Sequence, residues 1–444
     1  MEEPWIRLHQ NEDLPRGWVR LPEGTPGKAV RLRLGCAEVR ASQGEPAPAG
    51  ELQLARDLWE ALSVPYPGLR LRLRRSPPDQ VELGPAVGVI YPGRGRLPER
   101  EWVERARLYF GHRIGEPGLL GLGFDETIDW EGRRLLGYVI DNRPGRAGEV
   151  VKAWFPIPAA VRLTWSIRRE VIGGLRELTG NRAFNWIRSI GKWQFYSLLS
   201  AVEELKEHLP ETRRLQSAAD LAAMLARHEV VFVKQTHGIK GRRAAQVRRT
   251  TGGFRLCHIQ DGVHRERSIP RLEELVVALR QVTGAGRCVV QRGILTAGPE
   301  GRPLHFRIVT VRRAEGGWRV AVATACVARK SGTVFTNLAN GGADEEPLAS
   351  LERHYGMSPE EARRSLERME QLCLIASSAL TEAFDPLGML GFDVLVEQGS
   401  HRIWLLEANA VPGWGYPPEI QADLARSQTD LALALTGLGP RGRG

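Results

Sequence analysis

The stretch "GFDVLVEQGSHRIWLLEANAVPG", residues 391–413, decides the fold because it predicts two strands that carry acidic and amide side chains at their ends. Asp393 begins one strand, Glu407 and Asn409 end the other, and "QGS" forms the turn between them. Side chains alternate faces along a strand, so Glu407 and Asn409 point to the same side, and the turn brings Asp393 near Glu407. We therefore predict a hairpin with three oxygen-bearing side chains at the rim of a sheet.

These three side chains suit a hard divalent cation. Mg²⁺ takes carboxylate and amide oxygens as ligands and completes its shell with water and nucleotide phosphates. The competing interpretation is a surface hairpin whose charges are solvated. The Pro412-Gly413 turn, and the position of the set after two hairpins and a long helix, favour a metal site at Asp393, Glu407 and Asn409.

A second candidate for phosphate chemistry is "VFVKQTHGIKGRR", residues 231–243. A short apolar strand ends at Lys234, and a loop with two glycines follows. A Lys at a strand end can place its ammonium on a phosphate, while loop N–H groups hold other oxygens. The GxxxxGK[ST] loop and the GxGxxG fingerprint are both absent. The stretch is therefore either a phosphate-holding loop or an ordinary hairpin, and the predicted metal site favours the first.

Composition describes an ordinary globular protein of 444 residues, enough for two or three domains. No apolar run reaches the roughly 20 residues that span a bilayer. The acidic N-terminus lacks the apolar core of a signal peptide, so we expect a cytoplasmic protein without a membrane partner. Five cysteines stand far apart, which fits reduced thiols and offers no zinc framework; they are Cys36, Cys257, Cys288, Cys326 and Cys373.

The net charge of +10 makes nucleic acid the first partner to consider. Only seven of the 62 basic residues are Lys, however, and the Arg residues are scattered among acidic ones. A basic tail, a zinc finger and an aromatic nucleic-acid signature are all absent from the sequence. We therefore attribute the charge to an Arg-biased composition and place nucleic-acid binding last among the hypotheses. Acidic ligands remain compatible with it.

The chain divides into three parts by pattern. Residues 1–80 predict a small β-rich segment, and residues 81–184 predict an α/β domain. From about 185 to 435 we predict a helix capped by Ser217, a helix that ends near Gly284, a hairpin over 304–329, a helix from Ser358 to about Phe384, and the final hairpin.

Read together, these motifs resemble the YheC/YheD family of endospore coat-associated ATP-grasp proteins. The likeness covers roughly residues 81–425. The matching stretches, in the family's order, are "NWIRSIGKWQFYSLLS", "VFVKQTHGIKGR", "VVQRGI", "HFRIVTVRRAEGGWRV", "TNLANGG" and "LGMLGFDVLVEQGSHRIWLLEANAVPG". The resemblance implies an α/β (α+β) ATP-grasp fold over 185–435, with ATP between two subdomains, and an α/β pre-ATP-grasp-like domain before it.

The resemblance also implies a role for each matching residue. Lys192 and Lys234 would contact ATP phosphates from two strands of the smaller subdomain, and Arg307 would meet the γ-phosphate or an acyl-phosphate intermediate. Gln291 and the backbone through Ile294 would form the hinge that reads adenine. The remaining phosphate-binding positions would be Gly238, Lys240, Gly241, Asn337 and Asn340, and the metal set would hold one or two Mg²⁺ ions, with Mn²⁺ as an alternative.

The resemblance implies an ATP- and Mg²⁺-dependent carboxylate–amine ligase, with small-molecule or peptide substrates and a link to spore-coat proteins. The family pattern has an acidic residue where this chain has His305, and Ile239-Lys240 separates the two glycines of the loop. These departures leave nucleotide binding intact and put the substrate in question. The alternative hypothesis is a non-catalytic ATP-binding scaffold of the spore coat.

Overall fold

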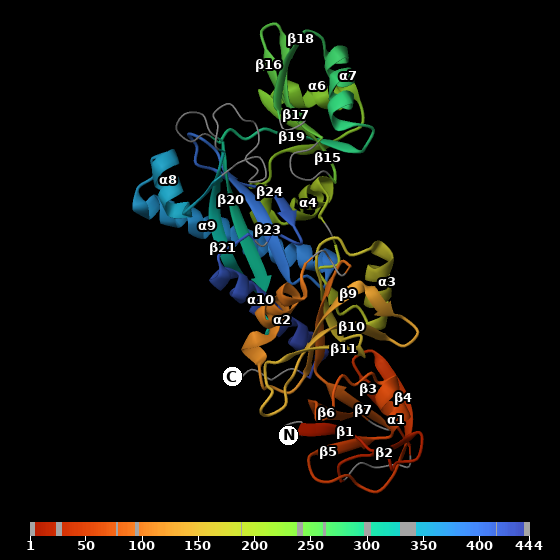
Figure 1. Cartoon of the computed structure of the whole chain (residues 1–444). Coiled ribbons are helices and arrows are strands. Elements are labelled where there is room, and N and C mark those ends of the chain that lie inside the picture. The colour runs from red at the N-terminus through yellow and green to blue at the C-terminus, as the bar shows by residue number, and fades with distance from the viewer. Residues whose placement is uncertain are drawn as a thin grey trace.

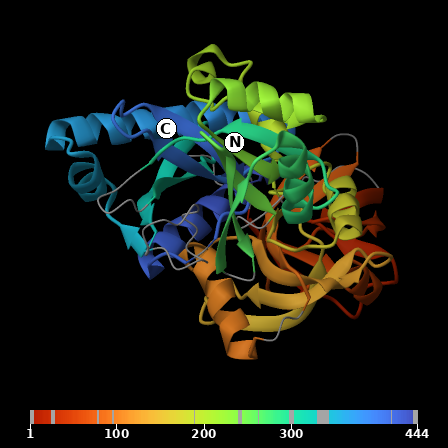
Figure 2. The same ribbon diagram turned by 90° about the horizontal axis from the view of Figure 1, so that it is seen from above.

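The computed structural model describes residues 5–23, 29–76, 79–93, 97–187, 189–237, 243–260, 263–296, 303–328, 343–413 and 415–438. Four sheets follow one another along an elongated molecule (Figure 1). A barrel lies at the N-terminal end and a small antiparallel sheet lies at the opposite end. Figure 2 shows the same arrangement from above, with the small sheet nearest the viewer. No helix among the described residues is long and apolar enough to cross a membrane.

The N-terminal barrel closes in the order β1-β5-β2-β4-β3-β7-β6. Its strands alternate buried residues with exposed or half-buried ones, as in "AVRLRL" of β3, because one face fills the barrel interior. The barrel continues to Gly84, just past the expected end of the first segment at residue 80. Its elements are β1 (Trp5–Gln10), β2 (Trp18–Arg20), β3 (Ala29–Leu34), β4 (Ala37–Gln43), β5 (Glu51–Leu54), α1 (Arg56–Ala61), β6 (Arg70–Ser76) and β7 (Gln80–Gly84).

The next sheet runs in the order β11-β10-β9-β8-β12-β13, with β9, β8, β12 and β13 parallel. Helix α2 packs on one face and α3 on the other. The elements are β8 (Ala86–Tyr91), α2 (Glu99–Phe110), the 3-10 turn η1 (Gly111–Arg113), β9 (Leu119–Asp129), β10 (Arg134–Ile140), β11 (Val150–Pro156), β12 (Ala160–Leu163), α3 (Arg169–Leu178) and β13 (Ala183–Phe184).

The small subdomain is an antiparallel sheet in the order β14-β19-β15-β16-β17-β18, with α6 and α7 packed on one face. Ser217 caps α6 through a capping box with Asp220, as predicted. The elements here, with the two helices that precede them, are α4 (Lys192–Leu199), α5 (Glu203–Lys206), β14 (Thr212–Leu215), α6 (Ala218–Arg227), β15 (Val230–Gln235), β16 (Ala244–Thr250), β17 (Gly253–Gln260), β18 (Val263–Ile269), α7 (Leu272–Thr283) and β19 (Cys288–Arg292).

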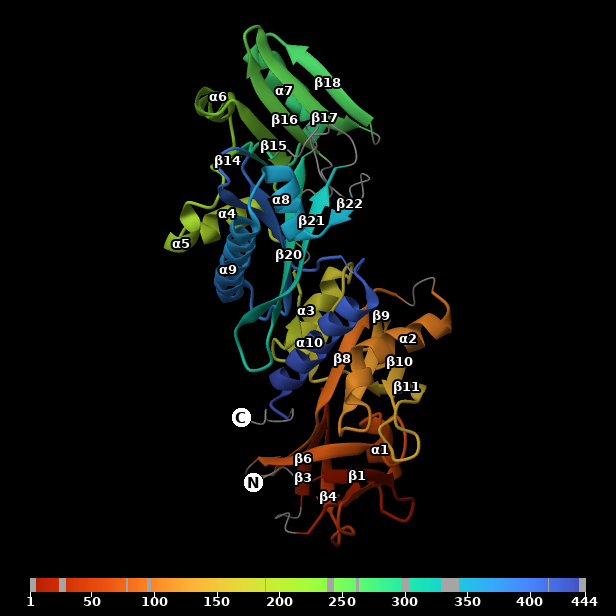
Figure 3. The ribbon, with the colours of Figure 1, turned by 90° about the vertical axis from the view of Figure 1, so that its left-hand side faces the viewer.

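The large subdomain is a sheet in the order β22-β21-β20-β23-β24. Helix α9, capped by Ser358 as predicted, covers one face. Helix α10 packs against both this sheet and α2, so it joins the C-terminal half to the parallel sheet (Figure 3). The elements are β20 (Leu304–Arg312), β21 (Trp318–Val327), β22 (Ala343–Glu345), α8 (Pro347–Tyr355), α9 (Pro359–Phe384), β23 (Met389–Val396), β24 (Ile403–Asn409) and α10 (Pro418–Thr436).

Candidate functional site

Four polar side chains form a row across the large sheet, on the face opposite α9. Thr324 of β21 pairs with Arg307 of β20, Arg307 pairs with Asp393 of β23, and Asp393 pairs with Glu407 of β24. Directly paired residues share a face of a sheet. The predicted hairpin is therefore confirmed, and it places Asp393 and Glu407 side by side with Arg307 as their neighbour.

Asp393 lies between two basic side chains of β20. Its Oδ1 is 2.7 Å from Nε of Arg307 and 3.8 Å from Nε2 of His305. Burial raises the pKa of Asp393 and lowers the pKa of His305. The charge of Asp393 raises the pKa of Arg307, so the guanidinium stays charged. Sequence reasoning marked His305 only as a departure from the family pattern, whereas the structure places it against the carboxylate.

The lysines that pair with Glu407 or lower its pKa come from elements outside the large sheet. Its Oε2 is 3.2 Å from Nζ of Lys192, in a pair whose side chains are 28% and 15% exposed. Burial acts to raise the pKa of Glu407, but Lys192 and Lys234 together outweigh it, and the net shift is downward. The carboxylate is therefore charged and binds cations in this conformation.

Lys192 does not lie in a strand, which corrects our prediction. It is the first residue of α4, and its backbone N–H donates to the carbonyl of Thr236 (3.0 Å) at the end of β15. A Cβ on Gly191 would lie 2.8 Å from the ring of His237, so glycine permits this close approach. A helix start and a strand end thus bring Lys192 and Lys234 to the same place, a long-range contact that local sequence pattern does not encode.

Lys234 lies in β15, as predicted, and a buried amide orients it. Its Nζ donates to Oε1 of Gln291 (3.0 Å), and Nε2 of Gln291 donates to Oγ1 of Thr212 (2.9 Å). Burial lowers the pKa of Lys234 to about 8. Lys234 therefore loses its charge as the pH rises through about 8, because burial disfavours the charged ammonium.

Gln291 lies within the small sheet, and its side chain is engaged in hydrogen bonds. Its side-chain amide bonds Lys234 and Thr212, and β19 is paired on both sides, by β14 and β15. The next two backbone N–H groups donate to carbonyls of Glu211 and Val230. Ile294 then leaves the sheet and is 8% exposed. The adenine role of Gln291 and Ile294 stays a prediction, and the structure adds an orienting contact from Gln291 to Lys234.

Five predicted phosphate-binding residues lie outside the part of the chain that the structure describes. They are Gly238, Lys240, Gly241, Asn337 and Asn340. Along the chain, β15 precedes the first group, and β21 and β22 flank the second.

The turn after β24 packs back over the site. Asn409 pairs with Gly391, where a Cβ would lie 2.7 Å from Cβ of Pro412, so glycine permits the close approach. Asn185 holds the next residue, because its Nδ2 donates to the carbonyl of Ala410 (2.5 Å). The Pro-Gly turn is thereby fixed beside Asp393 and Glu407. Asn185 was missed because its partner lies over 200 residues away.

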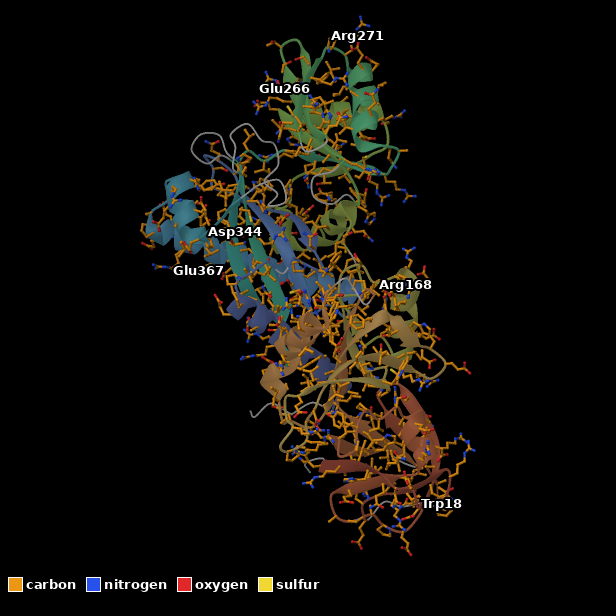
Figure 4. The ribbon with its side chains drawn as sticks, viewed as in Figure 1. Trp18, Arg168, Glu266, Arg271, Asp344 and Glu367 are labelled. Carbon is orange, nitrogen blue, oxygen red and sulfur yellow. The ribbon has the colours of Figure 1, made fainter. Side chains whose placement is uncertain are left out.

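Three further side chains adjoin the row and were not predicted as site residues: Cys326, Asp344 and Tyr416. Sγ of Cys326 on β21 donates to Oδ1 of Asp344 on β22 (3.2 Å), the edge strand of the large sheet (Figure 4). Tyr416 follows the Pro-Gly turn, and burial raises its pKa to about 12, so it is a neutral phenol. The "GWGYPP" run (413–418) was the available signal for Tyr416.

The chemistry of the donor set fits Mg²⁺, although protein cations hold its oxygens here. Asp393, Glu407 and Asn409 offer hard oxygen ligands from two adjacent strands. Within the described ranges, no group of three or more His, Cys, Asp or Glu residues is arranged to hold a metal ion. A metal at this place would therefore rely on two carboxylates, the Asn409 amide and oxygens from a ligand.

Comparison with known proteins identifies the class. The YheC/D like ATP-grasp family matches residues 180–432, which include α4, the small subdomain and nearly all of the large one. The chain therefore belongs to the YheC/D-like ATP-grasp family, and the predicted ATP-grasp fold is confirmed.

Individual relatives are more distant. The chain is 23% identical over 346 residues to the endospore coat-associated protein YheD of Bacillus subtilis (strain 168), covering 75% of this chain and 74% of that protein. Among solved structures it is similar to the VanG D-Ala:D-Ser ligase from Enterococcus faecalis (12% identity, TM-score 0.44, 79% of this chain and 98% of that one). It is also similar to the ATP-grasp ligase PsnB in complex with precursor peptide PsnA2 and AMPPNP (13%, 0.44, 78% and 98%).

Proposed function

We propose that this protein is an ATP- and Mg²⁺-dependent carboxylate–amine ligase that forms an amide through an acyl-phosphate intermediate. One observation carries the proposal: three cations from different elements converge on one carboxylate pair. Lys234 comes from the small subdomain, Lys192 from the helix before it and Arg307 from the large sheet. Such a cluster between two subdomains can bind a triphosphate, because its cations are already positioned to stabilise the negative charge of the phosphates.

In the proposed reaction, each residue acts by position and charge. Lys192 and Lys234 bind phosphate oxygens, and Arg307 stabilises the charge that develops on the transferred phosphoryl group. Asp393, Glu407 and Asn409 would hold Mg²⁺, which when bound neutralises charge on the phosphates. A substrate carboxylate attacks the γ-phosphorus of ATP and releases ADP, and an amine then attacks the acyl carbon and releases phosphate. Excluding water protects the acyl phosphate between the two steps.

A second candidate is an ATP-binding scaffold without turnover, in a cytoplasmic or coat-associated setting. The observation in its favour is that both predicted metal-binding carboxylates already have protein cations as partners. The name of the YheD relative supports a link to the endospore coat for either candidate. Production of ADP in the presence of candidate acids and amines would favour the ligase over the scaffold.

Calorimetry on the two lysines tests the phosphate site. The Lys192→Ala/Lys234→Ala protein should bind ATP at least about 100-fold more weakly, because each charge-assisted hydrogen bond contributes about 1.5–3 kcal/mol. Adenosine affinity should change less than about threefold. Lys152→Ala/Lys206→Ala is the matched control, since both lysines are well exposed. Equal losses for ATP and adenosine would show that the lysines do not read phosphate.

The lowered pKa of Lys234 predicts a pH dependence for ATP binding. In the free protein Lys234 loses its charge above about pH 8, whereas bound phosphates favour the ammonium, so binding takes up a proton. ATP affinity should then fall by up to about tenfold for each pH unit above 8. Lys234→Arg should remove this dependence, since Arg stays protonated. A wild-type affinity that is flat from neutral pH to pH 9.5 would contradict the prediction.

A further inference from the structure

The excess positive charge of the chain is confined to the small subdomain. Residues 212–294 contain 16 of the 62 Lys and Arg but only 6 of the 52 Asp and Glu, so this segment carries the whole net charge of +10. The rest of the chain is formally neutral. Composition does not show this uneven charge distribution, because Arg residues occur along the whole sequence. A compact domain with this charge attracts polyanions over several ångströms.

A groove runs around one end of the small sheet. It consists of two adjoining cavities of about 770 and 540 Å³ that share Leu215, Gln216, Gly286 and Cys288. One cavity opens toward α4, and the other lies between the start of α6 and the end of α7. The two cavities together have room for several residues of an extended chain.

Three exposed arginines line the groove: Arg214 and Arg287 in the first cavity and Arg280 in the second. Among the described residues, none of the three has an acidic partner within ion-pair distance, whereas neighbouring Arg213 pairs with Glu211. Two bonds from Thr236, N–H and Oγ1, to the carbonyl of Arg287 (2.9 and 3.0 Å) fix the backbone there. The groove therefore presents three exposed guanidinium groups, one of them on a backbone segment that Thr236 fixes.

The groove adjoins the candidate ATP site. Trp193 lines it directly after Lys192, and Gln235 lines it directly after Lys234. The N–H of Lys192 bonds the carbonyl of Thr236, which also lines the groove. Successive side chains of a strand point to opposite faces, so Gln235 faces the groove while Lys234 faces the candidate ATP site on the other side of β15. A chain held in the groove would therefore pass around this end of the sheet to reach the reacting centre.

We infer that the groove binds an acidic polypeptide segment, and that this segment belongs to the carboxylate substrate of the ligase; the second clause rests on the proposed function. Arg binds carboxylates through paired N–H donors. Nucleic acid is the other polyanion to consider, but single-strand sites stack bases on open aromatic rings. Among the described residues that line the groove, Trp193 is covered by the guanidinium of Arg214, 4.8 Å from the ring centre, and the imidazole of His237 is the other aromatic ring.

The test uses the full-length protein and a short fluorescein-labelled peptide of alternating Glu and Ser, followed by fluorescence anisotropy. Arg214→Glu/Arg287→Glu should weaken binding by about tenfold or more, because two attractive contacts become repulsive. Arg265→Glu/Arg267→Glu is the matched control, with the same charge change on exposed β18 of the same subdomain. It should weaken binding less than about threefold. If the groove variant has a lowered melting temperature, Arg214→Gln/Arg287→Gln replaces it. The expected loss of peptide affinity is then about half as large on a logarithmic scale.

Each outcome is decisive. If both charge-reversal variants lost the same affinity for the peptide, the attraction would be diffuse and the groove would not be the binding site. If a peptide with Gln in place of Glu bound equally well, the groove would not recognise carboxylates. Tighter binding of a single-stranded oligonucleotide of equal charge would assign the groove to nucleic acid instead. Wild-type protein that binds ATP but not the acidic peptide overturns this inference alone. Protein that binds the peptide but not ATP overturns the proposed ligase and leaves the groove standing.

Discussion

Glu407→Gln should abolish the gain in ATP affinity that Mg²⁺ gives and lower ATP-dependent turnover by about 100- to 1,000-fold. In the wild type, the carboxylate of Glu407 lies 3.2 Å from Nζ of Lys192 and also attracts the ammonium of Lys234. Neutralising it frees both ammonium groups, so ATP without metal should bind more tightly than to the wild type. The same change removes one proposed metal ligand, so Mg²⁺ should no longer improve binding. Calorimetry with and without Mg²⁺ measures both effects.

The matched control for Glu407 is Glu397→Gln in the same hairpin. Glu397 also has a cationic partner, with 2.5 Å between its Oε1 and Nη2 of Arg292, and its side chain is 18% exposed. It lies in the turn at the opposite end of the hairpin, so its loss should leave the Mg²⁺ response intact. A Glu407→Gln protein that kept the wild-type response to Mg²⁺ would remove Glu407 from the metal site.

The elements of the site that local pattern encodes were predictable. The hairpin with Asp393 and Glu407 followed from alternation and a Gly-containing turn, and the starts of α6 and α9 followed from their capping residues. Lys234 followed from its place at a strand end before a glycine loop. These features depend on neighbours within a few residues, so the sequence carries them directly.

Other parts of the fold depend on contacts that sequence separation hides. The strands β9 and β16–β18 were not predicted, since many of their positions carry Arg, Gly or other residues that weaken the alternation signal. The helical position of Lys192, the Gln291 contact to Lys234 and the Asn185 anchor all join distant segments. Tertiary packing decides such contacts, and a single sequence does not display them.

The concentration of net positive charge in one subdomain is another feature that the linear sequence does not display. The Arg residues look evenly scattered along the chain, yet residues 212–294 hold the entire excess. Only the fold shows that this segment is one subdomain with an exposed outer end, from which Glu266 and Arg271 project (Figure 4). A basic subdomain favours anionic ligands on both of its sides, the triphosphate at the proposed nucleotide site and the proposed acidic segment at the groove.

Arg307→Leu should destabilise the fold by about 2 kcal/mol, measured as a lower urea midpoint at pH 7. The variant leaves Asp393 without its nearest cation, 2.7 Å away, while the carboxylate stays mostly buried. Removing one member of a fully buried pair costs about 3–5 kcal/mol, and an exposed pair contributes at most about 1. The side chains of Arg307 and Asp393 are 22% and 14% exposed, which places this pair between the two limits.

A double variant separates the structural role of Arg307 from its proposed catalytic role. Arg307→Leu/Asp393→Leu should recover most of the lost stability, because neither charge then remains unpaired beneath the site. Turnover should stay lost, since the guanidinium and one proposed metal ligand are both absent. Arg312→Leu on the same strand is the control: its partner Asp385 is 56% exposed, so the cost should stay below about 1 kcal/mol. If the double variant were as unstable as Arg307→Leu, the cost would come from lost packing of the Arg307 stem rather than from the stranded carboxylate.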